Sequence, residues 1–189
     1  EPAHIDEALQ DEQTPEEIVI RLCEEKSRVV ATRHPERFVL AADTIVVVRS
    51  RLGEFTVLNQ PVDEADSRRM LAMLAGRTHE VFTAFCLRQK LSETVVTRVV
   101  QTVVQFKALS VREIEAYVAS GEGRDKAGSY AAQGIGAMLI ERIDGSYTNV
   151  VGLPLTEVAE VLERYGLWDP EVLASVGSAK VASINDDDR

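Results

Sequence analysis

An aspartate interrupts one of the most apolar stretches of the chain. Residues 38–48 read F-V-L-A-A-D-T-I-V-V-V, and this continuous apolar, β-branched character predicts a strand covered on both faces. An ionised carboxylate in such a strand is costly unless a cation or a metal ion pairs with it. Asp43 is therefore a candidate metal ligand or general base at the end of the strand, where open α/β sheets bind ligands. The alternative is a structural carboxylate at a sheet edge or a bulge, and the local pattern does not decide between the two.

A lysine falls on the apolar face of the helix expected before this strand. Ile18, Leu22 and Val29 recur at helical spacing, and Lys26 lies on the same stripe. A lysine in that position either extends its ammonium group to water or meets an acidic partner inside the protein. Asp43 is a candidate partner, because each charge would offset the burial of the other beside a phosphate.

A glycine-rich segment at residues 121–136 is a candidate anion-binding loop. Backbone amides in such a loop can approach an anion closely, and Arg124 and Lys126 supply positive charge. The segment matches neither the P-loop nor the dinucleotide pattern, because it contains no G-K-[ST] and follows no strand in a tight βα unit. On its own, a segment of this kind is most often only a turn.

The composition and the residue counts exclude several other classes of protein. Lysine and arginine number 21 against 31 aspartate and glutamate residues, and this net charge of −10 argues against binding to DNA or RNA polymers. Cys23 and Cys86 form neither a disulfide framework nor a zinc site, and we expect them to be reduced and buried. His4, His34 and His79 have no metal-ligand spacing, and we expect surface or packing roles for them.

No apolar run is long enough to cross a membrane, so we expect no membrane partner and a cytoplasmic location.

Helix and strand signals alternate along the chain. Capping residues, glycines and periodicity predict helices at residues 14–33, 63–76, 110–121 and from 154, and strands at 38–48, 80–87, 94–106 and 137–143. This order predicts an α/β fold with a mixed, twisted central sheet flanked by helices. The length suggests one domain, and we expect residues 169–189 to form a C-terminal tail.

Five segments resemble, in order and spacing, the Maf family of nucleoside triphosphate pyrophosphatases. They are A-D-T at 42–44, G-R-T-H-E-V at 76–81, E-A-Y-V-A-S-G at 115–121, D-K-A-G-S-Y at 125–130 and G-S-Y-T-N-V-V-G-L-P-L at 145–155. The resemblance implies a single domain over residues 1–168 with an elongated, two-lobed architecture similar to the inosine triphosphate pyrophosphatases. It also implies hydrolysis of a nucleoside triphosphate between the α and β phosphates with Mg²⁺ or Mn²⁺, and a homodimer.

The resemblance assigns roles to individual residues by their position in these motifs. Asp43 matches the proton acceptor that activates water and a metal ligand, Glu7 a second metal-side carboxylate, and Lys26 a catalytic, phosphate-binding cation. The substrate-binding positions are Thr44, Gln60, Thr78, Lys126 and Gln133, of which Thr44 and Gln133 are linked to base preference. The D-K-A-G-S-Y motif followed by Q-G looks like the subgroup that acts on dTTP and UTP, with modified pyrimidine nucleotides as further substrates. The implied role is housecleaning of the nucleotide pool, with an older link to septum formation.

The sequence departs from the family pattern at two places. It starts downstream of an opening strand and an S-x-S-P-R-R turn whose arginines hold the phosphates, and Gln60 stands where the family usually has a lysine before the proline. Either the opening segment precedes Glu1, or its loss weakens the enzyme. The alternative function is therefore a catalytically impaired, nucleotide-binding regulator of septum formation.

Overall fold

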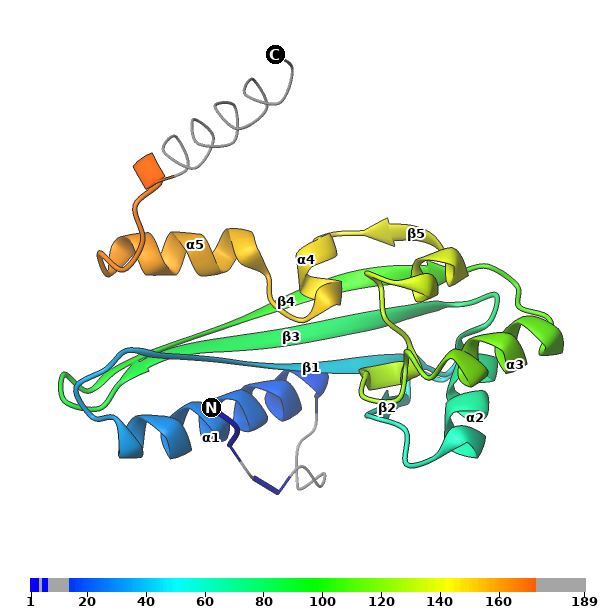
Figure 1. Ribbon diagram of the computed structural model, residues 1–189, viewed down its shortest axis with the longest axis horizontal. Helices are drawn as coiled ribbons and strands as arrows, with labels where there is room; N and C mark the ends of the chain where they lie inside the picture. The colour runs from blue at the N-terminus through cyan, green and yellow to red at the C-terminus, as the bar shows by residue number, and fades with distance from the viewer. Residues whose placement is uncertain (4, 7–13, 173–189) are drawn as a thin grey trace, which may run out of the picture. The chain divides into compact units, whose positions relative to one another are not determined.

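A five-stranded sheet forms the centre of the protein (Figure 1). The computed structural model describes residues 1–3, 5–6 and 14–172. Within these residues the strands lie in the order β2-β1-β3-β4-β5. Their bounds are β1 Val39–Arg49, β2 Phe55–Leu58, β3 Thr78–Gln89, β4 Thr94–Phe106 and β5 Ile140–Asp144. The predicted α/β class, a central sheet flanked by helices, is confirmed.

Every strand pair in the described residues is antiparallel, although we expected a mixed sheet. Short turns join β1 to β2 and β3 to β4, and a two-residue to five-residue connection permits only antiparallel pairing of neighbouring strands. The predicted pairing of the two middle strands is confirmed by twelve residue pairs from Thr78↔Gln105 to Gln89↔Thr94.

The first helix covers one face of this sheet. Helix α1 spans Pro15–Arg33 and begins with the predicted capping box, in which the side chains of Thr14 and Glu17 each accept a hydrogen bond from the backbone N–H of the other. Its apolar stripe packs on alternate residues of β1 and β3. The shared core consists of Ile18, Val19, Leu22, Cys23, Ile45, Val47, Phe82, Ala84 and Cys86. Both cysteines are buried free thiols, as we expected.

A second core lies on the intervening residues of the same strands. Val46 and Val48 of β1 join Val81 of β3 and residues of α2 (Glu64–Leu74) and α3 (Val111–Ser120). Helix α3 begins with the predicted capping box of Ser110 and Glu113 and ends at Gly121, which is left-handed. Because successive side chains of a strand point to opposite faces, β1 contributes to both cores.

The segment after α3 is less regular than we predicted. Two short 3₁₀ helices, η1 (Ala127–Ser129) and η2 (Ile135–Leu139), precede β5, so the strand that we expected from residue 137 begins only at Ile140. Gly134 and Gly136 favour a turn over an extended backbone here. The short helix α4 (Tyr147–Val151) then lies against β3 and β4 (Figure 1).

The chain divides into two compact units after Pro154. The second unit contains α5 (Leu155–Arg164), with Glu157 in its first turn and Arg164 in its last. The predicted extent of a single domain over residues 1–168, with a tail at 169–189, stays a prediction. In the part of the chain that is described, no helix combines the length and the apolar character that a membrane crossing requires.

Candidate active site

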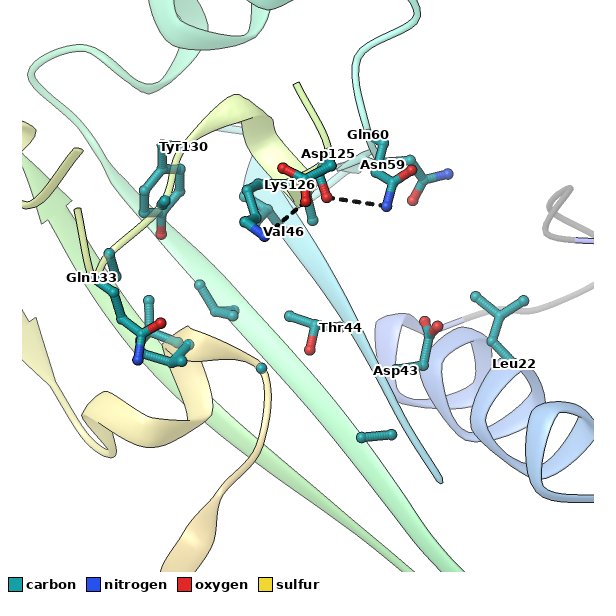
Figure 2. Close-up of a pocket in the computed structure, with 18 of the residues that line it drawn as sticks. Leu22, Asp43, Thr44, Val46, Asn59, Gln60, Asp125, Lys126, Tyr130 and Gln133 are labelled. Carbon is teal, nitrogen blue, oxygen red and sulfur yellow. Dashed lines mark hydrogen bonds and ion pairs between the residues drawn. The ribbon is translucent and has the colours of Figure 1, made fainter. Parts of the chain in front are cut away.

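A cleft of the first unit lies across an edge of strand β1. It has a cavity volume of about 270 Å³. Strand β2 pairs with β1 only from Val46 to Arg49, so in the described residues the preceding half of β1 is paired on its β3 side alone. The cleft opens at this half. Its walls come from α1, β1, the turn at residues 59–60, the loop at 125–133 and the end of α4 (Figure 2).

Asp43 and Lys26 form an ion pair on the α1 side of the cleft. The Lys26 ammonium group donates a hydrogen bond to Oδ1 of Asp43. The Asp43 side chain is only 9% exposed and the Lys26 side chain 24%. The predicted partnership is therefore present, and each charge offsets the desolvation of the other.

Asp43 does not lie at the end of its strand, as we expected from the general rule for open α/β sheets. It pairs with Ala84 in the middle of the β1–β3 ladder. That rule concerns parallel strands, whereas this sheet is antiparallel. The carboxylate lines the cleft instead beside the part of β1 that has no β2 partner.

Thr44 faces the cleft from the other side of β1. It alternates with Asp43 and shares its face with Val46, which belongs to the second core. Its hydroxyl oxygen lies 2.9 Å from that of Thr83, the residue opposite it on β3. The cleft therefore meets a charged pair on one face of the strand and a hydroxyl group on the other.

The glycine-rich loop is held in place by one carboxylate. Glu122 accepts hydrogen bonds from the N–H groups of Ile135 and Gly136, both at 2.8 Å, and from the hydroxyl of Tyr117 at 2.9 Å. Burial would raise the pKa of Glu122, but these hydrogen bonds hold it below its usual range. A Cβ atom on Gly134 would lie 1.8 Å from Oε1 of Glu122, so a side chain there would displace this carboxylate from its hydrogen bonds.

Gln60 and Lys126 meet at the same rim of the cleft (Figure 2). Gln60 Nε2 donates to the backbone carbonyl of Asp125 at 3.1 Å, and Lys126 Nζ donates to the Asp125 carboxylate at 2.9 Å. Gln60 thus ties the turn after β2 to the loop. Arg124, whose charge we expected at an anion site, instead pairs with Glu64 of α2 at 3.0 Å.

Tyr130 lines the cleft and is backed by His79. The tyrosine hydroxyl lies 2.8 Å from Nε2 of His79, and both rings pack edge-on against Phe106. Burial lowers the pKa of His79 to about 4 and raises the pKa of Tyr130, so both groups are neutral near pH 7. The expected packing role of His79 is what the structure shows.

The remaining predicted site residues are placed as follows. Gln133 lines the cleft. Thr78 does not, because it is exposed at the start of β3, where it pairs with Gln105. The motif resemblance implied a substrate contact at Thr78, whereas the residue of β3 that lines the cleft is Val81. Glu7, the second predicted metal ligand, and His4 lie outside the described residues.

Sequence reasoning missed several residues that build the cleft. Asn59 and the end of α4 line it, while Thr83, Glu122 and Asn149 hold its walls from behind. Thr83 and Asn149 are fully buried polar residues. The signal for Thr83 was a threonine inside the apolar run V-F-T-A-F-C-L at residues 81–87, which resembles the signal that singled out Asp43.

The donor set of the cleft fits a cation that arrives with phosphates. The described residues contain no cluster of three or more histidine, cysteine or acidic side chains that could hold a metal ion by themselves. Asp43 and Asp125 are the carboxylates among the lining residues. One or two carboxylates, completed by phosphate oxygens and water, are a common way for a protein to bind Mg²⁺.

A helix-flanked antiparallel sheet with a charged cleft at a strand edge, bordered by a glycine-rich loop, defines the class of this α/β protein. The chain belongs to the Maf-like protein family, whose pattern its residues 1–165 match. The family resemblance seen in the five sequence segments is thereby confirmed.

Three bacterial relatives carry the name dTTP/UTP pyrophosphatase. The protein of Syntrophus aciditrophicus (strain SB) is 46% identical over 165 residues, which are 87% of this chain and 78% of the relative. That of Geotalea uraniireducens (strain Rf4) is 47% identical over 86% of this chain and 81% of its own length. That of Myxococcus xanthus (strain DK1622) is 47% identical over 87% and 80%, respectively.

Proposed function

We propose that this chain is a pyrophosphatase that hydrolyses dTTP and UTP to the nucleoside monophosphate and pyrophosphate. The observation that carries the proposal is the Lys26–Asp43 pair in a cleft of a chain that is 46–47% identical to proteins named dTTP/UTP pyrophosphatase. Modified pyrimidine nucleotides would fit the same role, which is the removal of unwanted nucleotides from the cytoplasmic pool.

The hydrolysis requires a water molecule, a group that accepts its proton, and positive charge that stabilises the phosphate oxygens. In the proposed step, the water oxygen bonds to the α-phosphorus while the bond from that phosphorus to the α–β bridging oxygen breaks. Asp43 orients the water and accepts its proton, and pyrophosphate leaves with the bridging oxygen. Lys26 lies against Asp43 and stabilises the negative charge that spreads over the phosphate oxygens.

The loop side of the cleft would bind the rest of the nucleotide. Lys126 is a second cation for the phosphates, and its ammonium group would exchange Asp125 for a phosphate oxygen. Thr44 and Gln133 offer hydrogen-bonding groups to the base or the sugar. Gln60 has no charge to contribute, and we propose that it positions the loop through the Asp125 carbonyl.

A divalent cation, Mg²⁺ or Mn²⁺, completes the proposal. Asp43 would hold it together with the phosphate oxygens, and Glu7 is the proposed second carboxylate. When bound, the cation neutralises charge on the departing pyrophosphate.

Pyrophosphate release from dTTP, UTP, CTP, GTP and ATP, with Mg²⁺ or Mn²⁺, tests the proposal. We expect turnover of dTTP and UTP, and we expect Asp43→Asn to lower kcat by on the order of 10²–10⁴, because a positioned general base contributes about that much. Asp144→Asn makes the same change at an exposed position of β5 and should leave kcat unchanged.

The opposite result would be binding of dTTP and UTP without pyrophosphate release by the full-length protein. That outcome would favour the alternative reading of a nucleotide-binding regulator. Equal turnover by the wild type and Asp43→Asn would instead remove Asp43 from the mechanism.

A further inference from the structure

Two threonine hydroxyls meet across strands β1 and β3 at the wall of the cleft. Thr44 and Thr83 are opposite each other in the strand register, and their hydroxyl oxygens are 2.9 Å apart. Thr44 lines the cleft, whereas Thr83 is fully buried behind it. Either hydroxyl could donate in such a pair, so the direction of this hydrogen bond depends on the other partners of Thr83.

The Thr83 hydroxyl has a second hydrogen-bond partner, a backbone carbonyl. Its hydroxyl donates to the backbone carbonyl of Asn149, 3.0 Å away, and a carbonyl can only accept. A threonine hydroxyl has a single hydrogen. While Thr83 donates that hydrogen to the carbonyl, its oxygen can only accept a hydrogen bond from Thr44. In this arrangement Thr44 donates to Thr83, which leaves the acceptor side of the Thr44 oxygen for the cleft.

The Asn149 carbonyl oxygen also accepts from the N–H of Gly152 at 3.0 Å, and further bonds fix the Asn149 side chain and backbone N–H. Nδ2 of Asn149 donates to the carbonyl of Val81 at 3.1 Å and to Oγ1 of Thr102 at 3.0 Å. The Asn149 backbone N–H donates to Oγ of Ser146 at 3.2 Å. Asn149 and Thr83 are both 0% exposed, so bulk water does not compete for these groups.

We propose that Thr83 is a positioning residue that makes Thr44 a hydrogen-bond acceptor toward the cleft, so that the nucleotide meets Thr44 with an N–H or O–H donor. This inference rests on the proposed function and specifies which kind of hydrogen-bonding group of the nucleotide the site recognises. Uracil and thymine carry an imide N–H at ring position 3, where cytosine has a bare acceptor nitrogen. A sugar hydroxyl is the other donor that a nucleotide offers.

The space beside Thr44 is consistent with a ligand group at this position. Gly152 also lines the cleft, and a Cβ atom on it would lie 3.5 Å from the Thr44 oxygen. The glycine leaves that side of the hydroxyl uncovered by a side chain. A donor from the ligand can approach the oxygen there without displacing the Thr83 contact.

Four nucleotides and two substitutions test the inference. We would measure kcat/KM for UTP, CTP, N3-methyl-UTP and 3′-deoxy-UTP with the wild type, Thr83→Val and Thr83→Ser. In Thr83→Val the Thr44 hydroxyl loses its acceptor and turns to donate into the cleft. If the imide N–H is the donor, the preference of the wild type for UTP over CTP and N3-methyl-UTP falls about tenfold in Thr83→Val. Thr83→Ser keeps the hydroxyl and should restore the preference.

The second arm distinguishes the sugar from the base. If a sugar hydroxyl meets Thr44, the preference for UTP over 3′-deoxy-UTP falls in Thr83→Val, while the preference for UTP over CTP stays constant. Thr56→Val, an exposed threonine of β2, is the matched control and should change neither ratio. A ratio between two ligands is insensitive to a general loss of active protein.

Constant ratios in Thr83→Val, with normal turnover of UTP by the wild type, would overturn this inference and leave the proposed function intact. If the wild type hydrolyses no pyrimidine nucleotide, the proposed function fails. The same ratios, taken as dissociation constants from calorimetry, would then still decide whether Thr83 sets the direction of the Thr44 hydroxyl.

Discussion

His79 is a histidine that the fold holds in its neutral form. Only 2% of its surface is exposed, its Nε2 contacts the Tyr130 hydroxyl, and burial lowers its pKa to about 4 from an ordinary value of 6.5. In the unfolded chain the same imidazole takes up a proton at a higher pH than in the native state. A falling pH therefore favours unfolding through this residue.

We expect the free energy of unfolding to decrease as the pH falls from about 6.5 to about 4, with the His79 contribution complete above that window and lost below it. The pKa difference corresponds to about 3 kcal/mol. Urea unfolding between pH 4 and 7.5 measures this slope, and His79→Leu should flatten it. An unchanged slope in His79→Leu would show that another group causes the pH dependence.

Individual residues were predictable where burial conflicts with charge. The expected meeting of Asp43 and Lys26 followed from that conflict alone, because neither charge is stable in an apolar environment without the other. Thr83 and Asn149 are also buried polar groups that need hydrogen-bond partners, but they carry no charge. Their roles depend on which hydroxyl donates to which carbonyl, and this direction follows from three-dimensional contacts that no spacing in the sequence reveals.

The 121–136 loop illustrates how an element of the cleft is stabilised without regular secondary structure. Glu122 accepts hydrogen bonds from two backbone N–H groups and from the Tyr117 hydroxyl. The Tyr117 oxygen in turn accepts from the N–H of Ala131 at 3.0 Å. Removing the carboxylate would leave these donors to water or unpaired.

We expect Glu122→Ala to raise KM for UTP by roughly tenfold or more, because the loop then samples conformations in which Lys126 and Gln133 leave the cleft. The effect on kcat should be smaller, since Asp43 and Lys26 belong to other elements. Steady-state kinetics separate the two parameters. Glu115→Ala changes an exposed carboxylate of α3 and serves as the control. A fall in kcat at constant KM would place Glu122 in the chemical step instead.

Elements were predictable where capping chemistry marks their ends. Both capping boxes, at Thr14 and Ser110, begin helices at the expected residues. The start of β5 was set three residues too early, because the apolar residues after Gly136 suit a 3₁₀ helix as well as a strand. Local signals do not show that Glu122 holds this backbone in turns.

At the scale of the whole molecule, both thiols are inside the interface between α1 and the sheet. Cys23 and Cys86 are each 0% exposed, Cys23 Sγ donates to the carbonyl of Ala41 at 3.4 Å, and the Ser27 hydroxyl oxygen lies 3.2 Å from Cys86 Sγ. Burial raises the pKa of the Cys23 thiol. A reagent that attacks thiolates meets neither group in the native state.

We expect an aromatic disulfide reagent to label both cysteines at a single rate that equals the rate of unfolding. The rate should rise with urea in parallel with loss of the helical circular dichroism signal. Ser92→Cys introduces a thiol in the exposed β3–β4 turn and should react at once, as a positive control. Immediate labelling of one native cysteine would mean that α1 separates from the sheet without global unfolding.

The position of the cleft was the least predictable feature of the molecule. The order of helices and strands correctly suggested a helix-flanked sheet. However, the strand order and the point at which β2 stops pairing with β1 depend on long-range packing. The rule for parallel sheets therefore placed the site at a strand end, whereas the charge inside an apolar strand singled out Asp43, which lines the cleft.

The two sides of the cleft differ in how their backbone amides are protected. Asp43 and Thr44 belong to a ladder of nine consecutive residue pairs between β1 and β3, whereas Lys126 and Gln133 belong to a loop held by scattered contacts. Amides that are hydrogen-bonded across the β1–β3 ladder exchange with solvent mainly through larger openings of the sheet, and loop amides exchange through local fluctuations of low energy. The charged pair is thus preorganised in the resting protein, and the entropic cost of closing the cleft around a nucleotide falls on the loop.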